Sequence, residues 1–227
     1  QDRYFIMKTD SHIKSFVKRS GRITNIQKYF LNNREANNSF YTPRSLIDIS
    51  KLFNNDNPCI LDVGFGDGKL LINIAKKYPE FNFIGLEVYD SGIGNILKQI
   101  SNNEIENIKI LKIDAIVFLE KFIRNSSLYG ISLFFPDPWP KKKHYKRRLI
   151  NENFLNLISD KVQKGGFVKI ATDWPSYNES IVELFERNKR FHKTSDIVIY
   201  NERILTKFEK RGILLGHKIF DLTFKVN

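Results

Sequence analysis

The ten residues from Cys59 to Gly68, CILDVGFGDG, carry the clearest structural signal in the sequence. A short apolar run contains the acid Asp62 near its end, and a loop with glycine at every second position follows. An apolar run of this length indicates a buried strand, and the three glycines allow the backbone to turn tightly and to approach a ligand closely. The stretch therefore predicts a strand, a ligand-binding loop and a helix that begins near residue 69.

Further apolar runs follow along the chain and alternate with segments of helical periodicity. Such alternation produces βαβ units and a mostly parallel sheet. We therefore predict a doubly wound α/β domain, with DIVIY (196–200) and HKIFDLTF (217–224) as an antiparallel hairpin at one edge. The other expected strands are FNFIGLE (81–87), NIKILKI (107–113), GISLFF (130–135) and GFVKIAT (166–172), and the expected helices lie near 69–78, 91–101, 115–124, 150–160 and 176–188.

The residues before this regular pattern are polar and basic. We interpret residues 1–23 as a basic N-terminal arm and residues 24–227 as a single domain. Thr24 followed by Gln27 resembles a capping box and predicts a helix from about residue 25 to residue 31. A second helix is expected to start at Thr42-Pro43, because proline is favoured at the first helical position, and its apolar stripe would be Leu46, Ile49 and Phe53.

Composition narrows the class of protein. Of the 227 residues, 41% are hydrophobic and 27% are charged, which excludes a disordered tail and a low-complexity array. No apolar run approaches the roughly 20 residues of a membrane span, and a single cysteine, Cys59, excludes an internal disulfide framework. We expect a cytoplasmic protein with Cys59 in its core. The net charge of +12 favours a polyanionic partner, although lysines spread over a solvated surface would give the same value.

Acids lie at or just after the carboxyl ends of two further predicted strands, and the carboxyl ends of the strands are where such sheets bind ligands. Glu87 ends the second strand and is placed to accept hydrogen bonds from both hydroxyls of a ribose. Asp114 follows the third strand, where it either faces a ligand or caps the next helix. These positions favour a cofactor that contains adenosine.

Residues 134–149, FFPDPWPKKKHYKRRL, follow the fourth predicted strand. Two prolines flank Asp137 and fix the backbone where the chain leaves the strand. Tryptophan and six basic residues come next. A basic run is usually a solvated face, but beside a ligand-binding loop it favours a surface that binds phosphates.

This segment resembles the signature of the tRNA (guanine-N7-)-methyltransferase family, and most closely that of its bacterial members. Three further segments agree with the family in order: SFVKRSGRIT (15–24), ATDWPSY (171–177) and TKFEKRGILLGH (206–217). The glycine loop resembles the first motif of class I S-adenosylmethionine-dependent methyltransferases. The resemblance covers about residues 13–224. It implies a Rossmann-like class I methyltransferase fold, with a mostly parallel seven-stranded sheet, helices on both faces and an antiparallel edge hairpin.

The resemblance implies transfer of a methyl group from S-adenosyl-L-methionine to N7 of a guanosine in tRNA, namely guanosine 46 of the variable loop. It implies Asp137 as the catalytic residue, which would orient the guanine and stabilise its developing positive charge. The expected cofactor-binding residues are Asp62, Gly64, Gly66, Gly68, Glu87, Asp114 and Asp137. The expected substrate-binding residues are Lys141, Asp173, Thr206, Lys207, Phe208 and Glu209 from the resemblance, and Lys143, Lys146, Arg147 and Arg148 from their charge. Trp174 and Phe208 either stack on a base or pack inside the protein.

Two other classes of function remain open at this stage. An NAD(P)-dependent oxidoreductase also places an acid after its second strand, but Lys69 stands where the dinucleotide fingerprint requires its third glycine. A non-catalytic RNA-binding protein of the same fold is the other alternative. The four histidines show no metal-ligand spacing, so no metal site is expected. We expect a monomer or homodimer that binds tRNA and needs no membrane and no obligatory protein partner.

Overall fold

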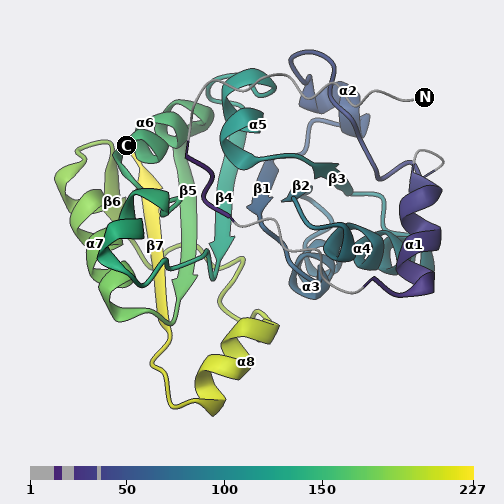
Figure 1. Cartoon of the computed structure of the whole chain (residues 1–227). Helices are drawn as coiled ribbons and strands as arrows, with labels where there is room; N and C mark the ends of the chain where they lie inside the picture. The colour runs from purple at the N-terminus through teal and green to yellow at the C-terminus, as the bar shows by residue number, and fades with distance from the viewer. Residues whose placement is uncertain (1–12, 17–22, 35–36) are drawn as a thin grey trace.

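A computed structural model describes residues 13–16, 23–34 and 37–227, so most of the predicted arm lies outside the described residues. The centre of the fold is a seven-stranded sheet in the order β3-β2-β1-β4-β5-β7-β6 (Figure 1). Strands β1 to β5 are parallel, and β7 is antiparallel to both of its neighbours. This topology confirms the predicted class I fold. The strands are β1 (Cys59–Val63), β2 (Asn82–Glu87), β3 (Ile108–Lys112), β4 (Leu128–Phe134), β5 (Val162–Thr172), β6 (Phe191–Lys193) and β7 (Phe220–Val226).

Helices cover both faces of the sheet, and the helices that pack on it do so through apolar stripes at helical spacing. In α4 the stripe consists of Ile93, Ile96, Leu97 and Ile100, all buried. One buried cluster joins α5, α6 and α7 to one face, and a second joins α3 and α4 to the other. The helices are α1 (Asn25–Asn32), α2 (Ile49–Phe53), α3 (Lys69–Lys77), α4 (Asp90–Asn103), α5 (Ala115–Lys121), α6 (Glu152–Lys161), α7 (Pro175–Arg187) and α8 (Lys207–Leu214), with a 3₁₀ helix, η2 (Lys142–Arg147).

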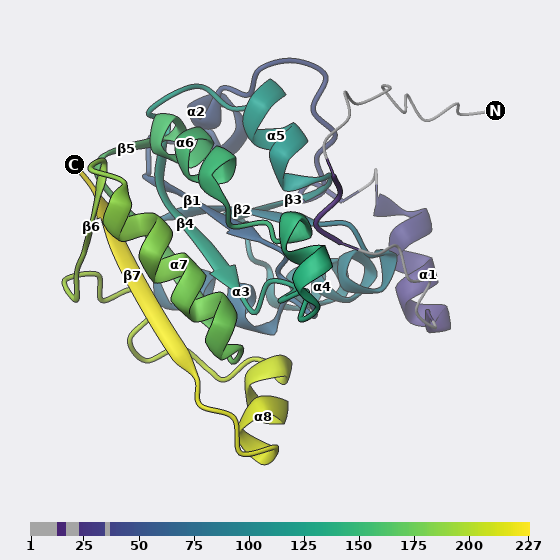
Figure 2. The same cartoon turned by 60° about the vertical axis from the view of Figure 1, so that its left-hand side comes forward.

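Helix α8 lies apart from the other helices. Figures 1 and 2 show it beyond the start of β7, on the side of the sheet where β4 and β5 end. This is the edge at which ligands bind in open α/β sheets. None of the helices in the described part of the chain has the length and apolar character needed to cross a membrane.

The N-terminal helices agree with the sequence in one case and differ in the other. The capping box of Thr24 and Gln27 is present at the start of α1, as predicted. The helix predicted to start at Thr42-Pro43 is wrong, because α2 begins only at Ile49. Its cap is Asp48, whose carboxylate accepts the backbone N–H of Lys51 at 3.2 Å. An aspartate cap closer to the apolar residues therefore sets the start of the helix.

The antiparallel edge is built from a different segment than predicted. The partner of β7 at the edge is β6, Phe191–Lys193, and residues 196–200 form no strand. The side chains of Ile199 and Tyr200 are buried in the core on the face covered by α3 and α4. The end of the apolar run, Ile199 and Tyr200, therefore packs into the core from a loop instead of pairing with β7, whereas Val198 is exposed.

Candidate active site

Asp62, near the end of β1, lies next to a polar residue of the neighbouring strand. The sheet register pairs Asp62 with Ser132 of β4, whose hydroxyl donates to the Asp62 carboxylate at 3.1 Å. The hydroxyl of Tyr200 donates to Ser132 in turn, also at 3.1 Å. Asp62 is only 4% exposed, and burial raises its pKa to about 7, with a smaller contribution from the nearby charge of Glu87. A buried carboxyl is thereby fixed at the ligand-binding edge.

The glycine loop between β1 and α3 has the backbone that its sequence predicts. Gly64, Gly66 and Gly68 all have positive φ, between 61° and 76°, which only glycine adopts without strain. A Cβ atom added to Gly64 or Gly66 would meet nothing within 4 Å. These two glycines therefore face open space, and the loop leaves room for a ligand in front of α3.

Glu87, at the end of β2, holds this loop through its carboxylate. One carboxylate oxygen accepts the backbone N–H of Gly66 at 3.0 Å, and the other accepts those of Val88 and Tyr89 at 2.7 and 3.1 Å. Burial raises the pKa of Glu87, and the nearby charge of Asp137 raises it further. Sequence reasoning placed Glu87 at the site but missed this contact with the glycine loop.

Asp114 caps α5. Its carboxylate accepts the backbone N–H groups of Ile116 and Val117 at 2.9 and 3.2 Å. Of the two roles that the sequence left open, the helix cap is therefore present. A contact with a cofactor remains a prediction.

Asp137 is exposed at the same edge, in the loop that leaves β4. Phe135 and Trp139 on either side of it have φ of +56° and +43°, values that are uncommon for residues other than glycine. Asp137 lies close enough to Glu87 for its charge to affect the pKa of that residue, and Glu87 similarly affects Asp62. Three carboxyl groups are thus gathered at one place, where they would favour a cationic ligand.

A cavity of about 250 Å³ opens between the glycine loop and the start of α8. Phe134, the last residue of β4, lies on its wall. The cavity brings together six of the predicted site residues from two distant parts of the chain, and adds Lys69 and Lys210, which sequence reasoning missed. The predicted residues on the wall are Asp62, Gly64, Gly66, Thr206, Lys207 and Phe208.

The basic segment after Asp137 forms η2. Lys141, Lys143 and Lys146 are exposed, and the guanidinium of Arg147 lies 5.0 Å from the ring centroid of Trp139. The Trp139 indole N–H donates to the carbonyl of Ser15 at 2.8 Å, which ties the described part of the arm to this loop. Four positive side chains next to Asp137 therefore form a surface suited to phosphates.

Arg148 does not belong to this surface, which corrects the prediction that it contacts tRNA. It is 4% exposed, and its guanidinium donates to the carbonyls of Pro138 and Ser176 and to the hydroxyls of Ser176 and Ser180, at 2.9 to 3.2 Å. The same group stacks 3.8 Å from the ring centroid of Tyr145. Arg148 therefore joins the Asp137 loop to α7 and is not accessible to a nucleic acid.

The remaining candidates lie around α8. Asp173, just after β5, contacts Nδ1 of His217 at 2.9 Å. Phe208 is 58% exposed, which favours the stacking role over core packing, whereas Trp174 packs against the core. Glu209 is buried and belongs to the start of α8. Cys59 is buried as expected. No group of three or more potential metal ligands occurs among the described residues.

Comparisons with known proteins agree on one family. A family model described as "Putative methyltransferase" matches residues 56–222. A protein of Mannheimia succiniciproducens named tRNA (guanine-N(7)-)-methyltransferase is 37% identical over 219 residues, which is 95% of this chain and 88% of the relative. A protein of the same name from Colwellia psychrerythraea is 40% identical over 216 residues, which is 93% of this chain and 88% of the relative.

Solved structures share the fold at lower identity. The crystal structure of a 30S ribosomal A1408 methyltransferase from an uncultured bacterium matches with a TM-score of 0.54 and 20% identity. The match covers 82% of this chain and 98% of that structure. At this identity the likeness establishes the class I methyltransferase architecture alone.

Proposed function

The chain belongs to the tRNA (guanine-N7-)-methyltransferase family, and from this membership we propose that it methylates N7 of a guanosine in tRNA. The methyl donor is S-adenosyl-L-methionine. Following the family resemblance, we further propose guanosine 46 of the variable loop as the target. The observation that carries the proposal is the closeness of Asp137 to Glu87, which holds the glycine loop, together with the basic helix η2 that follows Asp137 in the chain.

The residues at this edge fit the proposed cofactor. Gly64 and Gly66 turn an open backbone surface toward the ligand, and the carboxyl groups of Asp62, Glu87 and Asp137 lie where a cationic donor would favour their charged forms. When bound, the cofactor supplies a sulfonium methyl group, and the bond from carbon to sulfur breaks as the bond to N7 forms, with the electron pair leaving on sulfur. Asp62, Gly64, Gly66, Gly68, Glu87, Asp114 and Asp137 are the proposed binding residues.

Asp137 is the proposed catalytic residue. Guanine N7 attacks with a lone pair, so no proton has to be removed and no general base is needed. The methylated base becomes a cation, and a carboxylate held beside it stabilises that charge as it develops. Prolines flank Asp137 on both sides and restrict the backbone that carries it, which limits the movement of the loop before the substrate arrives.

The surface formed by Lys141, Lys143, Lys146 and Arg147 is proposed to bind tRNA phosphates and to bring the target base to Asp137. Phe208, exposed on the wall of the cavity, is proposed to stack on that base. Asp173, Thr206 and Lys207 complete the proposed substrate-binding region, whereas the buried Glu209 would act by holding the first turn of α8 in place. Because the proposed substrate is tRNA, we propose that the enzyme acts in the cytoplasm, as a monomer or homodimer without an obligatory protein partner.

The test is incorporation of labelled methyl from S-adenosyl-L-methionine into unmodified tRNA. We expect label in 7-methylguanosine, with borohydride–aniline cleavage at position 46. A matched tRNA with adenosine at position 46 serves as the control and should take up no label. Label in another nucleoside, or no label despite measured cofactor binding, would refute the proposal.

A further inference from the structure

We propose that Arg203, which precedes α8, is a positioning residue for methyl transfer: it fixes the first turn of α8 at the wall of the cavity that faces the glycine loop. This inference rests on the proposed function. It concerns a side chain that is not among the residues that line the cavity.

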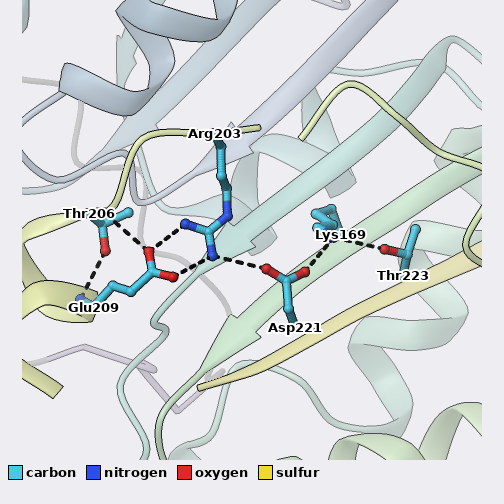
Figure 3. Close-up of polar contacts among 6 residues, drawn as sticks. All are labelled: Lys169, Arg203, Thr206, Glu209, Asp221 and Thr223. Carbon is cyan, nitrogen blue, oxygen red and sulfur yellow. Dashed lines mark hydrogen bonds and ion pairs between the residues drawn. The ribbon is translucent and has the colours of Figure 1, made fainter. Parts of the chain in front are cut away.

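Arg203 joins α8 to the sheet through two acids (Figure 3). Its guanidinium donates to both carboxylate oxygens of Glu209, and Nη2 also donates to Asp221 of β7 at 3.0 Å. The side chains of Arg203 and Glu209 are each only 5% exposed. A bidentate, buried pair of this kind fixes both distance and orientation.

These contacts form a polar network that runs from Glu209 through Arg203 and Asp221 to Lys169 and Thr223. Its end away from α8 is anchored in strands β5 and β7. Asp221 forms an ion pair with Lys169 of β5, and the Lys169 ammonium also donates to the hydroxyl of Thr223 at 3.0 Å (Figure 3). Lys169 and Thr223 are directly opposed in the sheet register. Arg203 is thus tied to a rigid part of the fold.

The near end sets the geometry of the cavity wall. Besides accepting from Arg203, the Glu209 carboxylate accepts the backbone N–H of Thr206 at 3.2 Å, and the Thr206 hydroxyl accepts the N–H of Glu209 at 3.1 Å. This capping box closes the first turn of α8, and Thr206, Lys207 and Phe208 of that turn line the cavity. Through the hydrogen bonds of this capping box, Glu209 therefore fixes the positions of the three cavity-lining residues that precede it.

Arg203 also contacts a second part of the cavity wall. Its guanidinium lies 4.9 Å from the ring centroid of Phe134, which lines the same cavity three residues before Asp137. The Arg203 side chain therefore contacts both the first turn of α8 and strand β4, which leads to Asp137, and sets the distance between them. Lysine cannot reproduce this arrangement, because it has neither the planar fork nor the stacking face of a guanidinium.

A buried ion pair is weak support for stability, since desolvation offsets much of its attraction. A displacement of about 1 Å near a reaction centre, by contrast, lowers the rate by up to about 100-fold. The network is therefore expected to affect the positioning of the tRNA base more than the stability of the fold.

The test compares Arg203→Lys and Arg203→Met with wild type. The matched control is Arg190→Lys, because Arg190 forms an ion pair with Asp160 outside the cavity wall. We expect Arg203→Lys to lower kcat/KM for tRNA about 10-fold and Arg203→Met up to about 100-fold. The affinity for S-adenosyl-L-methionine, measured by calorimetry, should change less than threefold, and Arg190→Lys should match wild type in both assays.

All rates are compared at a temperature where thermal melting shows each variant fully folded. Wild-type kcat/KM in fully folded Arg203→Lys and Arg203→Met would overturn the inference. So would an equal loss of cofactor affinity, because Arg203 would then shape the cavity as a whole. If wild type itself forms no 7-methylguanosine, the proposed function fails, whereas an active wild type with active Arg203 variants rejects the role of Arg203 alone.

Discussion

The backbone of Gly92 in α4 packs directly against the carbonyl oxygen of Gly66, so that a Cβ atom at position 92 would lie 2.5 Å from that oxygen. The same atom would lie 3.0 Å from Cγ of Glu87, the residue that accepts the N–H of Gly66. Gly66 is therefore held from two sides, by a carboxylate and by a helix that has no side chain at this position.

Gly92→Ala is expected to weaken the binding of S-adenosyl-L-methionine about 10-fold or more. Alanine normally stabilises a helix interior by about 0.5–1 kcal/mol relative to glycine. Here the added methyl group must displace Gly66, so the glycine loop loses the shape that faces the ligand. Calorimetric titration of the cofactor measures the effect, and Ser101→Ala, at an exposed position of the same helix, is the control. Equal affinities for wild type and Gly92→Ala would contradict this account of the loop.

Asp137→Asn is expected to lower kcat by about 100-fold or more while leaving cofactor affinity within a few-fold of wild type. Asparagine keeps the size of the side chain but removes the charge that stabilises the methylated base, a type of change that costs about 100- to 1,000-fold. Single-turnover rates with saturating tRNA and cofactor separate the chemical step from binding. A variant with the wild-type rate would exclude Asp137 from catalysis.

The triple variant Lys143→Ala, Lys146→Ala, Arg147→Ala is expected to bind tRNA more weakly and with a smaller salt dependence. Each lost phosphate contact reduces the slope of log affinity against log salt by about 0.7 to 0.9. Binding measured between 50 and 200 mM salt gives the slope. Lys164→Ala, which removes an exposed lysine in the first half of β5, is the control and should leave the slope unchanged. An unaltered slope in the triple variant would place the tRNA elsewhere.

Arg148→Met is expected to destabilise the fold by about 2–4 kcal/mol, since it removes four buried hydrogen bonds that contribute roughly 1 kcal/mol each. Its salt slope for tRNA, measured below the melting temperature, should equal that of wild type, because Arg148 is buried. Chemical denaturation gives the loss of stability. A reduced salt slope in the folded variant would show that Arg148 reaches the tRNA after all.

The contrast between Arg147 and Arg148 shows where sequence reasoning stops. Both belong to one basic run, and nothing local distinguishes them. The burial of Arg148 depends on Ser176 and Ser180 of α7, about 30 positions away, which offer it hydroxyl and carbonyl acceptors. A prediction from charge alone therefore treats a structural arginine as a phosphate ligand.

The parallel strands and the glycine loop were predictable because their signals are local. Apolar runs of strand length and glycines at every second position depend on neighbouring residues only. The prediction of a strand at 196–200 was wrong because it also used only local signals. Ile199 and Tyr200 are buried in a loop, and their burial depends on residues of other elements that pack around them. The pair of Asp62 and Ser132 left a faint signal, a polar residue within the apolar run GISLFF, and only the sheet register places the two together.

Asp62 supplies the last prediction, which concerns pH. Burial raises the pKa of Asp62 to about 7, whereas the unfolded chain has the ordinary value near 3.9. Between these values the folded state holds a proton that the unfolded state releases, so this group's contribution to stability is complete below about pH 4 and is lost as the pH rises through about 7.

Asp62→Asn removes the cost of a buried charge while keeping an oxygen that can accept the Ser132 hydroxyl. Relative to wild type, the variant should therefore gain a few kcal/mol of unfolding free energy between pH 5 and pH 8, since one pKa unit corresponds to about 1.4 kcal/mol. Urea denaturation of both proteins without cofactor at the two pH values measures the difference, and parallel changes in the two proteins would show that the Asp62 carboxyl ionises as it does in the unfolded chain.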